Sequence, residues 1–285
     1  PFDRTVPVSP DNNWKHLTFA KTYASKYDIV HTGPQTRDLL AGAAKARGAR
    51  IVHTMHAAPP VDEVIDGNAR LIQQADVLTA VSKYVRKWAQ QDLGIDAEIH
   101  VIPNGVDLDL FNPANAPTED GVFRFVGSFS RNKHPEFVLE LARAMPEYDF
   151  ELIGDGPEGA ELRRQAADCA NVEIRTPIAD KGVLAREYAS ATALLVPFER
   201  EGFGLVVLEA LASGTPVVGL YSGNISNLVD DQSNGFLCSE LDIEEWKRAL
   251  LAVSDTPSLS PRASVAEYAW ENVASRYDDL YRSLL

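Results

Sequence analysis

Short apolar stretches alternate with amphipathic segments along most of the chain. The short stretches are rich in Val, Ile, Leu and Phe and are bounded by turn-forming residues, a pattern that predicts buried β-strands. The segments between them repeat apolar residues at helical spacing. We expect strands at residues 28–31, 50–54, 77–80, 100–102, 122–126, 149–153, 172–175, 193–196, 216–219 and 235–237.

Helical patterns separate most of these strands, which is typical of parallel α/β architecture. We expect helices at residues 36–47, 83–93, 136–144, 160–168, 182–191, 205–212 and 243–252. Residues 104–118 are rich in Asn, Pro and Asp and are predicted to be a linker, and residues 254–261 form a second break before a final helix. The second half of the chain therefore predicts a complete Rossmann-like domain, whereas the first half does not.

The composition is that of an ordinary soluble globular protein, with 45% hydrophobic and 24% charged residues. The 285 residues are enough for two domains, each with its own core. No apolar run is long enough to span a bilayer, and we expect a cytoplasmic protein. Residues 1–108 contain 12 Lys and Arg against 12 Asp and Glu, so the net charge of −14 falls on the remainder. This acidic second half disfavours a nucleic-acid partner.

One segment, from Glu201 to Gly219, indicates specific chemistry. It begins with Glu-Gly-Phe-Gly and continues into a predicted helix. A glycine-bearing loop that enters a helix leaves unpaired amides at the positive end of the helix dipole, which suits a phosphate. Glu209 lies about two turns into the helix, too far along to cap it, and is free to accept hydrogen bonds from hydroxyls. A site that holds phosphate and a polyol together indicates a nucleotide-sugar.

This segment resembles the E-x7-E signature of the retaining GT-B glycosyltransferases of glycosyltransferase family 4. Other segments resemble further motifs of that family in the same order: the inter-domain segment at 101–113, the phosphate loop at 125–133, the strand and turn at 152–157, and the closing helix at 269–273, followed by Tyr281. The resemblance runs from about Asp28 to the C-terminus. It implies an α/β, GT-B-like fold of two Rossmann-type parallel-sheet domains facing a cleft, with the N-terminal domain incomplete.

The resemblance implies three parts. They are a partial acceptor-side domain at 1–108, a nucleotide-sugar-binding domain at 109–265, and a C-terminal helix at 266–285 that packs back toward the N-terminal domain. Residues 1–20 have no clear counterpart, and the start at Pro1 indicates a trimmed or partial chain. A sheet without its first strands has an open edge. We expect a partner chain or a second copy to cover that edge, or the chain to be a fragment.

The resemblance also implies roles for individual residues. Glu209 would bind the ribose hydroxyls of the donor, and Glu201 would lie near the hydroxyls of the transferred sugar or act as a catalytic carboxylate. Without the family, Glu209 would be a solvated helix carboxylate and Glu201 an acid favoured by the helix dipole. The donor diphosphate would bind the backbone amides of Gly202, Phe203, Gly204 and Leu205.

The phosphate loop departs from the family pattern. Lys133 matches the lysine that pairs with the donor phosphate, where its charge would stabilise the departing diphosphate. Gly127-Ser128 stands where the family usually has Gly-Arg, so one of two usual cations is missing. Arg131 is the nearest replacement in the loop, although its position does not match the motif. A second departure is Asn227, where an acidic residue is common.

The nucleotide base and the N-terminal domain add further candidates. By the same resemblance, the nucleotide base would bind near Pro177 and Ile178, through backbone groups. Backbone groups do not distinguish uracil from guanine, so the donor is either a UDP-sugar or a GDP-sugar. His56 matches the N-domain histidine that faces the donor sugar, although a lone histidine is often a packed core residue. His53 lies three positions earlier, and on a strand end the two side chains would point to opposite faces, so no metal site is expected.

Two other cofactor readings receive little support. Cys169 and Cys238 match no metal-binding spacing and are expected to be reduced core thiols. Gly154-Asp-Gly-Pro-Glu-Gly159 matches a dinucleotide fingerprint, but Pro157 removes an amide that a pyrophosphate would need. We therefore expect no NAD and no other cofactor beyond the UDP- or GDP-sugar substrate.

The acceptor is expected to be a glycan or a lipid-linked hydroxyl. Residues 81–91 present Lys83, Arg86 and Lys87 on one helix face. That face is either an ordinary solvated surface or a peripheral contact with anionic lipid at the cytoplasmic side of a membrane.

The main hypothesis is a retaining, metal-independent glycosyltransferase that uses a nucleotide-diphosphate sugar. The short first domain and Ser128 motivate an alternative, a non-catalytic nucleotide-sugar-binding or assembly subunit with the same fold. A GT-B-related epimerase is a third reading and would need additional acids and histidines in the cleft. A dehydrogenase is the fourth and would bind NADH.

Overall fold

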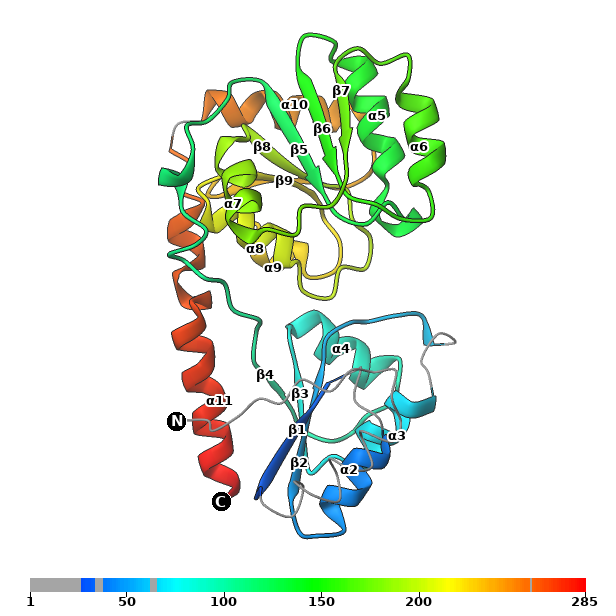
Figure 1. The fold of residues 1–285 in the computed structure, drawn as a ribbon, viewed down its shortest axis with the longest axis vertical. Helices are drawn as coiled ribbons and strands as arrows, with labels where there is room; N and C mark the ends of the chain where they lie inside the picture. The colour runs from blue at the N-terminus through cyan, green and yellow to red at the C-terminus, as the bar shows by residue number, and fades with distance from the viewer. Residues whose placement is uncertain (1–26, 34–37, 62–65, 257) are drawn as a thin grey trace. The chain divides into compact units, whose positions relative to one another are not determined.

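The computed structural model describes residues 27–33, 38–61, 66–256 and 258–285. The chain divides into two compact units (Figure 1). Unit 1 comprises Pro1–Pro103 together with Ala274–Leu285, and unit 2 comprises Asn104–Val273. Each unit contains one parallel sheet.

Within the described residues, the sheet of unit 1 has four strands in the order β1-β2-β3-β4. The strands are β1 (Ile29–Thr32), β2 (Arg50–Met55), β3 (Val77–Ala80) and β4 (Ile99–Val101), and the helices before α11 are α2 (Asp38–Lys45), α3 (Asp66–Gln74) and α4 (Lys83–Gln91). Ala41 and Ala44 on α2 pack with Ile51 and Leu71 in a buried cluster. Their small side chains let the helix lie close to the sheet.

Most of α11 (Trp270–Leu284), from Ala274 onward, belongs to unit 1 and contacts strand β1. The imidazole of His31 on β1 lies 2.5 Å from the hydroxyl of Tyr281 through Nδ1 and 2.5 Å from that of Thr54 through Nε2. The ring of Tyr277 lies 5.2 Å from the His31 ring, centroid to centroid. Burial, followed by the neighbouring Tyr277, raises the pKa of Tyr281 to about 12, so its hydroxyl stays protonated.

Unit 2 has six strands in the order β10-β9-β8-β5-β6-β7, all parallel. The strands are β5 (Val122–Val126), β6 (Asp149–Ile153), β7 (Val172–Arg175), β8 (Ala193–Val196), β9 (Val217–Leu220) and β10 (Gly235–Cys238). The helices that lie between or follow these strands are α5 (Pro135–Ala144), α6 (Gly159–Ala166), α7 (Lys181–Ser190), α8 (Leu205–Ala212), α9 (Ile225–Leu228) and α10 (Ile243–Asp255). The chain winds outward from β5 in one direction and from β8 in the other.

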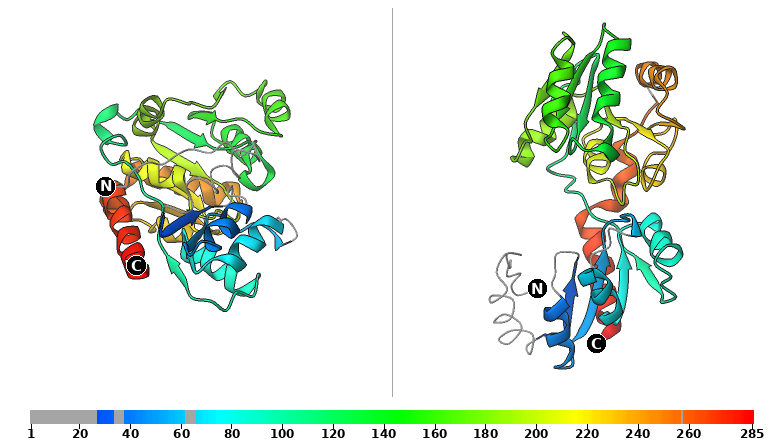
Figure 2. Two further views of the ribbon diagram at one scale, coloured as in Figure 1. Left: turned by 60° about the horizontal axis from the view of Figure 1, so that its bottom comes forward. Right: turned by 90° about the vertical axis from the view of Figure 1, so that its right-hand side faces the viewer.

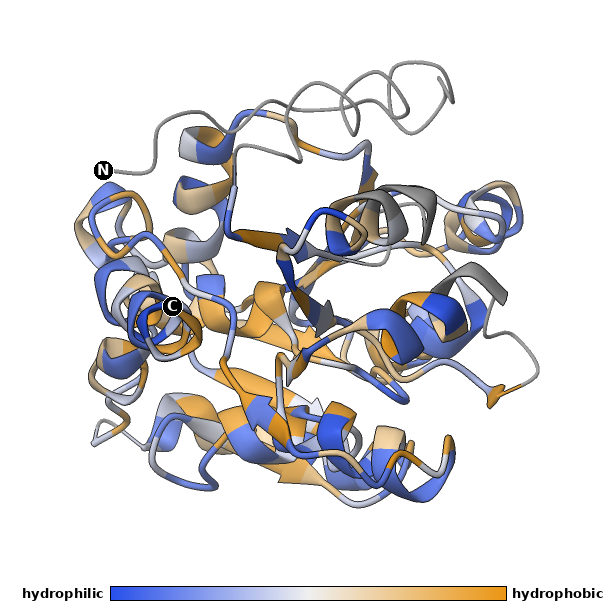
Figure 3. Ribbon diagram, turned by 90° about the horizontal axis from the view of Figure 1, so that it is seen from below, coloured by the Kyte–Doolittle hydropathy of each residue, from blue (hydrophilic) through white to orange (hydrophobic). Residues whose placement is uncertain are grey.

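Helices cover both faces of this six-stranded sheet (Figure 2). α5 packs against α6 and α10 on one face, and α8 packs against α7 and α9 on the other. β8 and β9 are buried along their whole length, as expected for strands of a parallel sheet covered on both sides. Because both faces of these strands are buried, their sequences are unbroken apolar runs. Hydrophobic colours dominate the strands of the sheet in Figure 3.

The structure confirms the predicted α/β fold with two parallel sheets, of which the N-terminal one is smaller. Every predicted strand is present, with ends within one residue of the expected positions. α3 and α9 were not predicted. Cys169 and Cys238 are both buried and unpaired. Among the described residues, no helix combines the length and apolarity needed to cross a membrane.

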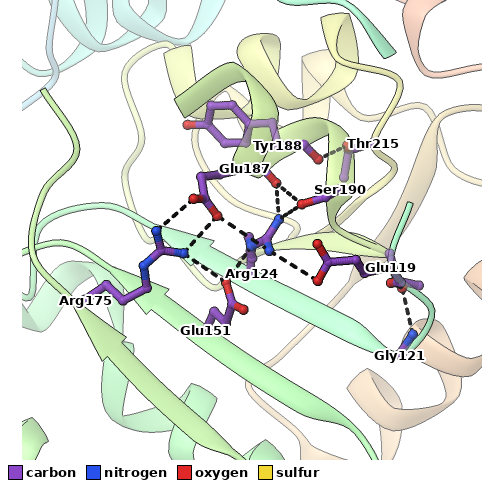
Figure 4. Close-up of polar contacts among 10 residues, drawn as sticks. Glu119, Gly121, Arg124, Glu151, Arg175, Glu187, Tyr188, Ser190 and Thr215 are labelled. Carbon is purple, nitrogen blue, oxygen red and sulfur yellow. Dashed lines mark hydrogen bonds and ion pairs between the residues drawn. The ribbon is translucent and has the colours of Figure 1, made fainter. Parts of the chain in front are cut away.

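A buried charge cluster fastens α7 to three strands of the sheet (Figure 4). Arg124 on β5 is 2% exposed, and its Nε lies 2.7 Å from Oε2 of Glu151 on β6. Its Nη2 lies 3.5 Å from Oε2 of Glu187 on α7, and Nη1 donates to the backbone carbonyl of Glu187 and to Ser190 Oγ. Arg175, at the end of β7, donates two hydrogen bonds to Glu187, at 2.7 and 2.9 Å.

The cluster brings two guanidinium groups together with three carboxylates, because Oε2 of the more exposed Glu119 also lies 4.0 Å from Nη2 of Arg124. Burial alone would raise the pKa of Glu187, but the hydrogen bonds from Arg175 and the charges of Arg124 and Arg175 hold it below its ordinary value. Because the acids are paired, the helix is held in register with the sheet at this point.

We expect Arg124→Met to destabilise the protein by about 3–5 kcal/mol, because it leaves two largely buried carboxylates without this partner. The measurement is urea unfolding followed by circular dichroism and tryptophan fluorescence. The double variant Arg124→Met, Glu187→Met should recover part of the loss. Arg164→Met, which breaks an exposed pair with Glu161, is the matched control and should change little. Equal effects of Arg124→Met and the control would contradict the role of the cluster.

The burial of His53 predicts that the stability of unit 1 depends on pH. It is 2% exposed, and its Nδ1 lies 2.9 Å from Thr32 Oγ1. Burial, and then the charges of His31 and His56, lower its pKa from 6.5 to about 4. The unfolded chain therefore binds a proton at this site between pH 6.5 and 4 that the folded chain does not, so stability falls as the pH drops through this range.

We expect the thermal unfolding midpoint to fall between pH 7.5 and 5.5, a range that lies above most carboxylate titration. His53→Asn should show a shallower dependence over the same range, because one titrating group has been removed. The same slope in both proteins would show that His53 does not contribute to the pH dependence.

Candidate active site

The carboxyl ends of β5 and β8 lie side by side at the point where the strand order of unit 2 reverses. Ligands of open α/β sheets bind in the crevice at such a point. The loop after β5 contains Gly127, Ser128, Arg131 and Lys133, and the loop after β8 contains Glu201. A backbone hydrogen bond of 2.9 Å from the amide of Glu199 to the carbonyl of Asn132 joins the two loops.

The loop after β5 rests on the turn after β6. The amide of Gly127 donates to Ile153 at 3.1 Å, and the amide of Phe129 donates to Asp155 at 2.9 Å. A Cβ atom on Gly154 would lie 1.9 Å from the carbonyl oxygen of Gly127, and one on Gly156 would lie 2.5 Å from that of Phe129. The glycines of this turn are therefore explained by close contact with the neighbouring loop.

Lys133 lies at the end of the 3₁₀ turn η4 (Arg131–Lys133). Its ammonium group forms an ion pair with Oε2 of Glu201 and lies 3.9 Å from the centroid of the buried Phe198 ring. Arg131 is exposed, and its guanidinium contacts no partner within the part of the chain that the structure describes. Ser128 is also exposed, with its hydroxyl 2.7 Å from Ser130 Oγ. The structure thus pairs Lys133 with Glu201 and leaves Arg131 at the surface.

The second loop enters α8 through Gly204, whose φ of 97° favours glycine. Oε1 of Glu201 accepts hydrogen bonds from the amides of Phe203, at 3.2 Å, and Gly204, at 3.1 Å. Two of the four amides expected to face a diphosphate therefore donate to a carboxylate of the same loop. The amide of Leu205, the first of α8, has no acceptor among the described residues.

Asn224 holds this loop in place, a role that sequence reasoning missed. It is 4% exposed, its amide donates to the carbonyl of Glu201 at 2.8 Å, and its side chain donates to that of Phe203 at 2.8 Å. The only sequence signal is its place in a Ser-Gly-Asn turn directly after a strand. Asn227, three residues further along the same segment, is exposed.

Glu209 lies inside unit 2 and is 8% exposed. Its Oε1 accepts from Lys181 Nζ at 2.8 Å, and its Oε2 accepts from the Tyr188 hydroxyl at 3.1 Å. Burial, followed by the negative charge of Glu209, raises the pKa of Tyr188 well above its ordinary value, so the phenol remains a donor. A carboxylate accepts about four hydrogen bonds, so Glu209 keeps lone pairs for a ligand hydroxyl.

Lys181 and Tyr188 both lie on α7 and were not identified from the sequence. Lys181 follows Asp180, whose side chain caps the helix by accepting from the amides of Gly182 and Val183. Pro177 and Ile178 lie in the loop that leads into this cap, Pro177 exposed and Ile178 partly buried. The contact between Lys181 and Glu209 therefore brings the predicted base-binding loop close to the predicted ribose carboxylate.

Unit 1 contains the remaining candidate, His56. It lies directly after β2 and is exposed, whereas His53 is buried within the strand. Lys83 and Lys87 on α4 are exposed, while Val85 and Trp88 on the same helix are buried. Among the described residues, no three or more His, Cys, Asp or Glu side chains gather in a way that would hold a metal ion.

Two family models match consecutive parts of the chain. Residues 1–110 match the model of Glycosyltransferase Family 4, and residues 120–256 match that of Glycosyl transferases group 1. The D-inositol 3-phosphate glycosyltransferase of Nocardioides sp. is 29% identical over 307 residues, which cover 90% of this chain and 67% of that protein. The protein of the same name from Mycolicibacterium smegmatis is 30% identical, over 86% of this chain and 64% of its own length. The chain thus spans about two thirds of the length of these relatives.

Solved structures show the same fold. Sucrose-phosphate synthase from Thermosynechococcus elongatus aligns with a TM-score of 0.77 at 25% identity, over 98% of this chain and 80% of that one. Anabaena HepE, solved in complex with UDP-glucose, aligns with a TM-score of 0.78 at 19% identity, over 94% of this chain and 82% of that one. The fold is GT-B-like, and the chain belongs to glycosyltransferase family 4, the glycosyl transferases group 1, whose members transfer a sugar from a nucleotide-sugar donor.

Proposed function

We propose that the protein is a retaining, metal-independent glycosyltransferase that moves a hexosyl group from a UDP- or GDP-sugar to a hydroxyl acceptor. The observation that supports this most is the placement of Lys133 beside the loop that begins α8, with the buried Glu209 about one turn into that helix. Cation, helix amides and carboxylate match the phosphate and the polyol of one donor molecule.

The diphosphate is proposed to bind Lys133 and the amides at the start of α8, including that of Leu205. A fixed positive charge and oriented amides stabilise negative charge as it develops on the departing diphosphate. Proton removal from the acceptor is not the difficult step. The electrostatic support of the leaving group is therefore the main contribution of unit 2 to the rate.

Glu209 is proposed to accept hydrogen bonds from the ribose hydroxyls. Tyr188 and Lys181 hold its carboxylate from the α7 side. The base is proposed to lie near Pro177 and Ile178 in the loop before that helix. Glu201 and, from unit 1, His56 are proposed to contact the transferred sugar, and Arg131 to approach the phosphates from the surface of its loop.

The names of similar proteins suggest the first substrates to test. HepE was solved with UDP-glucose, and the curated relatives are named for D-inositol 3-phosphate. We therefore propose UDP-glucose and D-inositol 3-phosphate as the first donor and acceptor, with GDP-sugars and other hydroxyl acceptors as the next set. A peripheral contact of Lys83 and Lys87 with anionic lipid is proposed only for a lipid-linked acceptor.

With UDP-glucose, whose glucosyl group is α-linked, we expect an α-linked product because the proposed enzyme retains configuration. The anomeric proton signal and its coupling constant in ¹H NMR report this directly. The rate should be unchanged by EDTA. A β-linked product would refute retention, and loss of activity in EDTA would refute metal independence. Nucleotide binding without transfer or hydrolysis over the whole substrate set would favour the non-catalytic subunit.

Glu209→Gln and Lys133→Met should each lower kcat/KM for the donor by about 10- to 100-fold, since each removes a charge-assisted hydrogen bond of roughly 1.5–3 kcal/mol. Initial rates at varied donor concentration provide the measurement. Glu140→Gln on the exposed side of α5 and Lys247→Met on α10 are matched controls and should retain full activity. Unchanged kcat/KM in both site variants would contradict the assigned roles.

A further inference from the structure

The carboxylate of Glu201 already uses the donors that the proposed function assigns to a diphosphate. Its Oε1 accepts from the amides of Phe203 and Gly204, and its Oε2 pairs with the ammonium group of Lys133. A carboxylate and a phosphate are both anions that only accept hydrogen bonds. Glu201 therefore acts at these groups as an internal substitute for a phosphate oxygen.

The backbone beneath this contact is held independently of the carboxylate. Asn224 donates to the carbonyls of Glu201 and Phe203 on either side of Gly202. Because the carbonyl and the amide of one trans peptide unit point in opposite directions, the bond to the Phe203 carbonyl leaves the amide of Gly204 pointing away from Asn224. Glu201 can consequently leave by rotating about its own side-chain bonds, while the amides keep their orientation.

The carboxylate and the diphosphate exclude one another. Both are negative, both require Lys133, and the side chains of Glu201 and Lys133 are only 19% and 18% exposed, so water screens them weakly. When a diphosphate binds, Glu201 loses two amide hydrogen bonds and an ion pair. This loss lowers affinity unless new donors reach the carboxylate.

An intact sugar nucleotide supplies such donors, because the hydroxyls of its sugar can donate to a displaced carboxylate. A nucleoside diphosphate without the sugar supplies none at this position. The two ligands therefore differ most in the hydrogen bonds that they can donate to the Glu201 carboxylate.

We propose that Glu201 is a specificity-determining residue that makes the site select an intact nucleotide-sugar over the nucleoside diphosphate left by the reaction. The inference rests on the proposed function, in that the diphosphate is taken to bind Lys133 and the start of α8. After transfer, the sugar hydroxyls leave with the acceptor. Glu201 then returns to Lys133 and the amides and displaces the nucleoside diphosphate, which favours product release.

The test compares Glu201→Gln with the wild-type 285-residue chain by isothermal titration with UDP, GDP, UDP-glucose and GDP-glucose. Gln keeps the shape of the side chain but lacks its charge, so it competes weakly for Lys133. We expect the variant to bind the nucleoside diphosphate at least about tenfold more tightly than wild type. Affinity for the sugar conjugate should stay equal or weaken, and transfer should become more sensitive to inhibition by the diphosphate product.

Two further variants separate the possible failures. Glu201→Ala should tighten diphosphate binding in the same direction, with thermal unfolding checked for both variants. Glu209→Gln should weaken nucleotide and nucleotide-sugar equally, because the ribose is common to both. If Glu209→Gln behaves so while neither Glu201 variant binds the diphosphate more tightly, the selectivity inference is overturned and the proposed function stands. If no protein in the set binds any of the four ligands, both fall.

Discussion

The parallel pairing of β5 with β8 determines where the candidate site of unit 2 lies. The chain leaves these two neighbouring strands in opposite directions, so no crossover helix covers the space between their carboxyl ends. The loops that follow them must therefore meet, and they are joined by the hydrogen bond between Glu199 and Asn132 and by the pair of Lys133 with Glu201. The rest of the unit stabilises this contact between the loops. Helices on both faces bury the strands, and the side chain of Asn224 donates a hydrogen bond to the carbonyl of Phe203 in the second loop.

The buried charged residues of unit 2 all have partners. One helix, α7, contributes both to the Arg124 cluster and to the contacts of Glu209. α7 presents Glu187 to Arg124 and Arg175 on the sheet (Figure 4). The hydroxyl of the next residue, Tyr188, donates to Glu209. A helix fixed at Glu187 cannot rotate or slide without moving the Tyr188 hydroxyl. The ion cluster therefore has a second effect beyond stability, because it defines the position from which the Glu209 carboxylate is held.

Local patterns made most of the fold predictable from the sequence. Strands such as β8 and β9 are continuous apolar runs with turn residues at both ends, and α8 begins where Gly204 indicates. α9 is a single turn, too short for a periodic pattern, and it was missed. The role of Arg124, which lies within an apolar strand, was not predicted because its partners are 27 and 63 residues away in the sequence. Lys181, Tyr188 and Asn224 were missed for the same reason, since only the tertiary fold brings them to the E-x7-E segment. The assigned roles of the motif residues and the domain boundaries stay predictions.

The glycines of the turn after β6 act on the candidate site without touching a ligand. Because Gly154 and Gly156 have no Cβ atom, the backbone of the loop after β5 lies in direct contact with the backbone of this turn. The height of that loop above the sheet determines how far Lys133 projects toward its anion. Two glycines that have no polar side chain therefore determine the position of Lys133, because a Cβ atom at either residue would force the loop after β5 away from the turn.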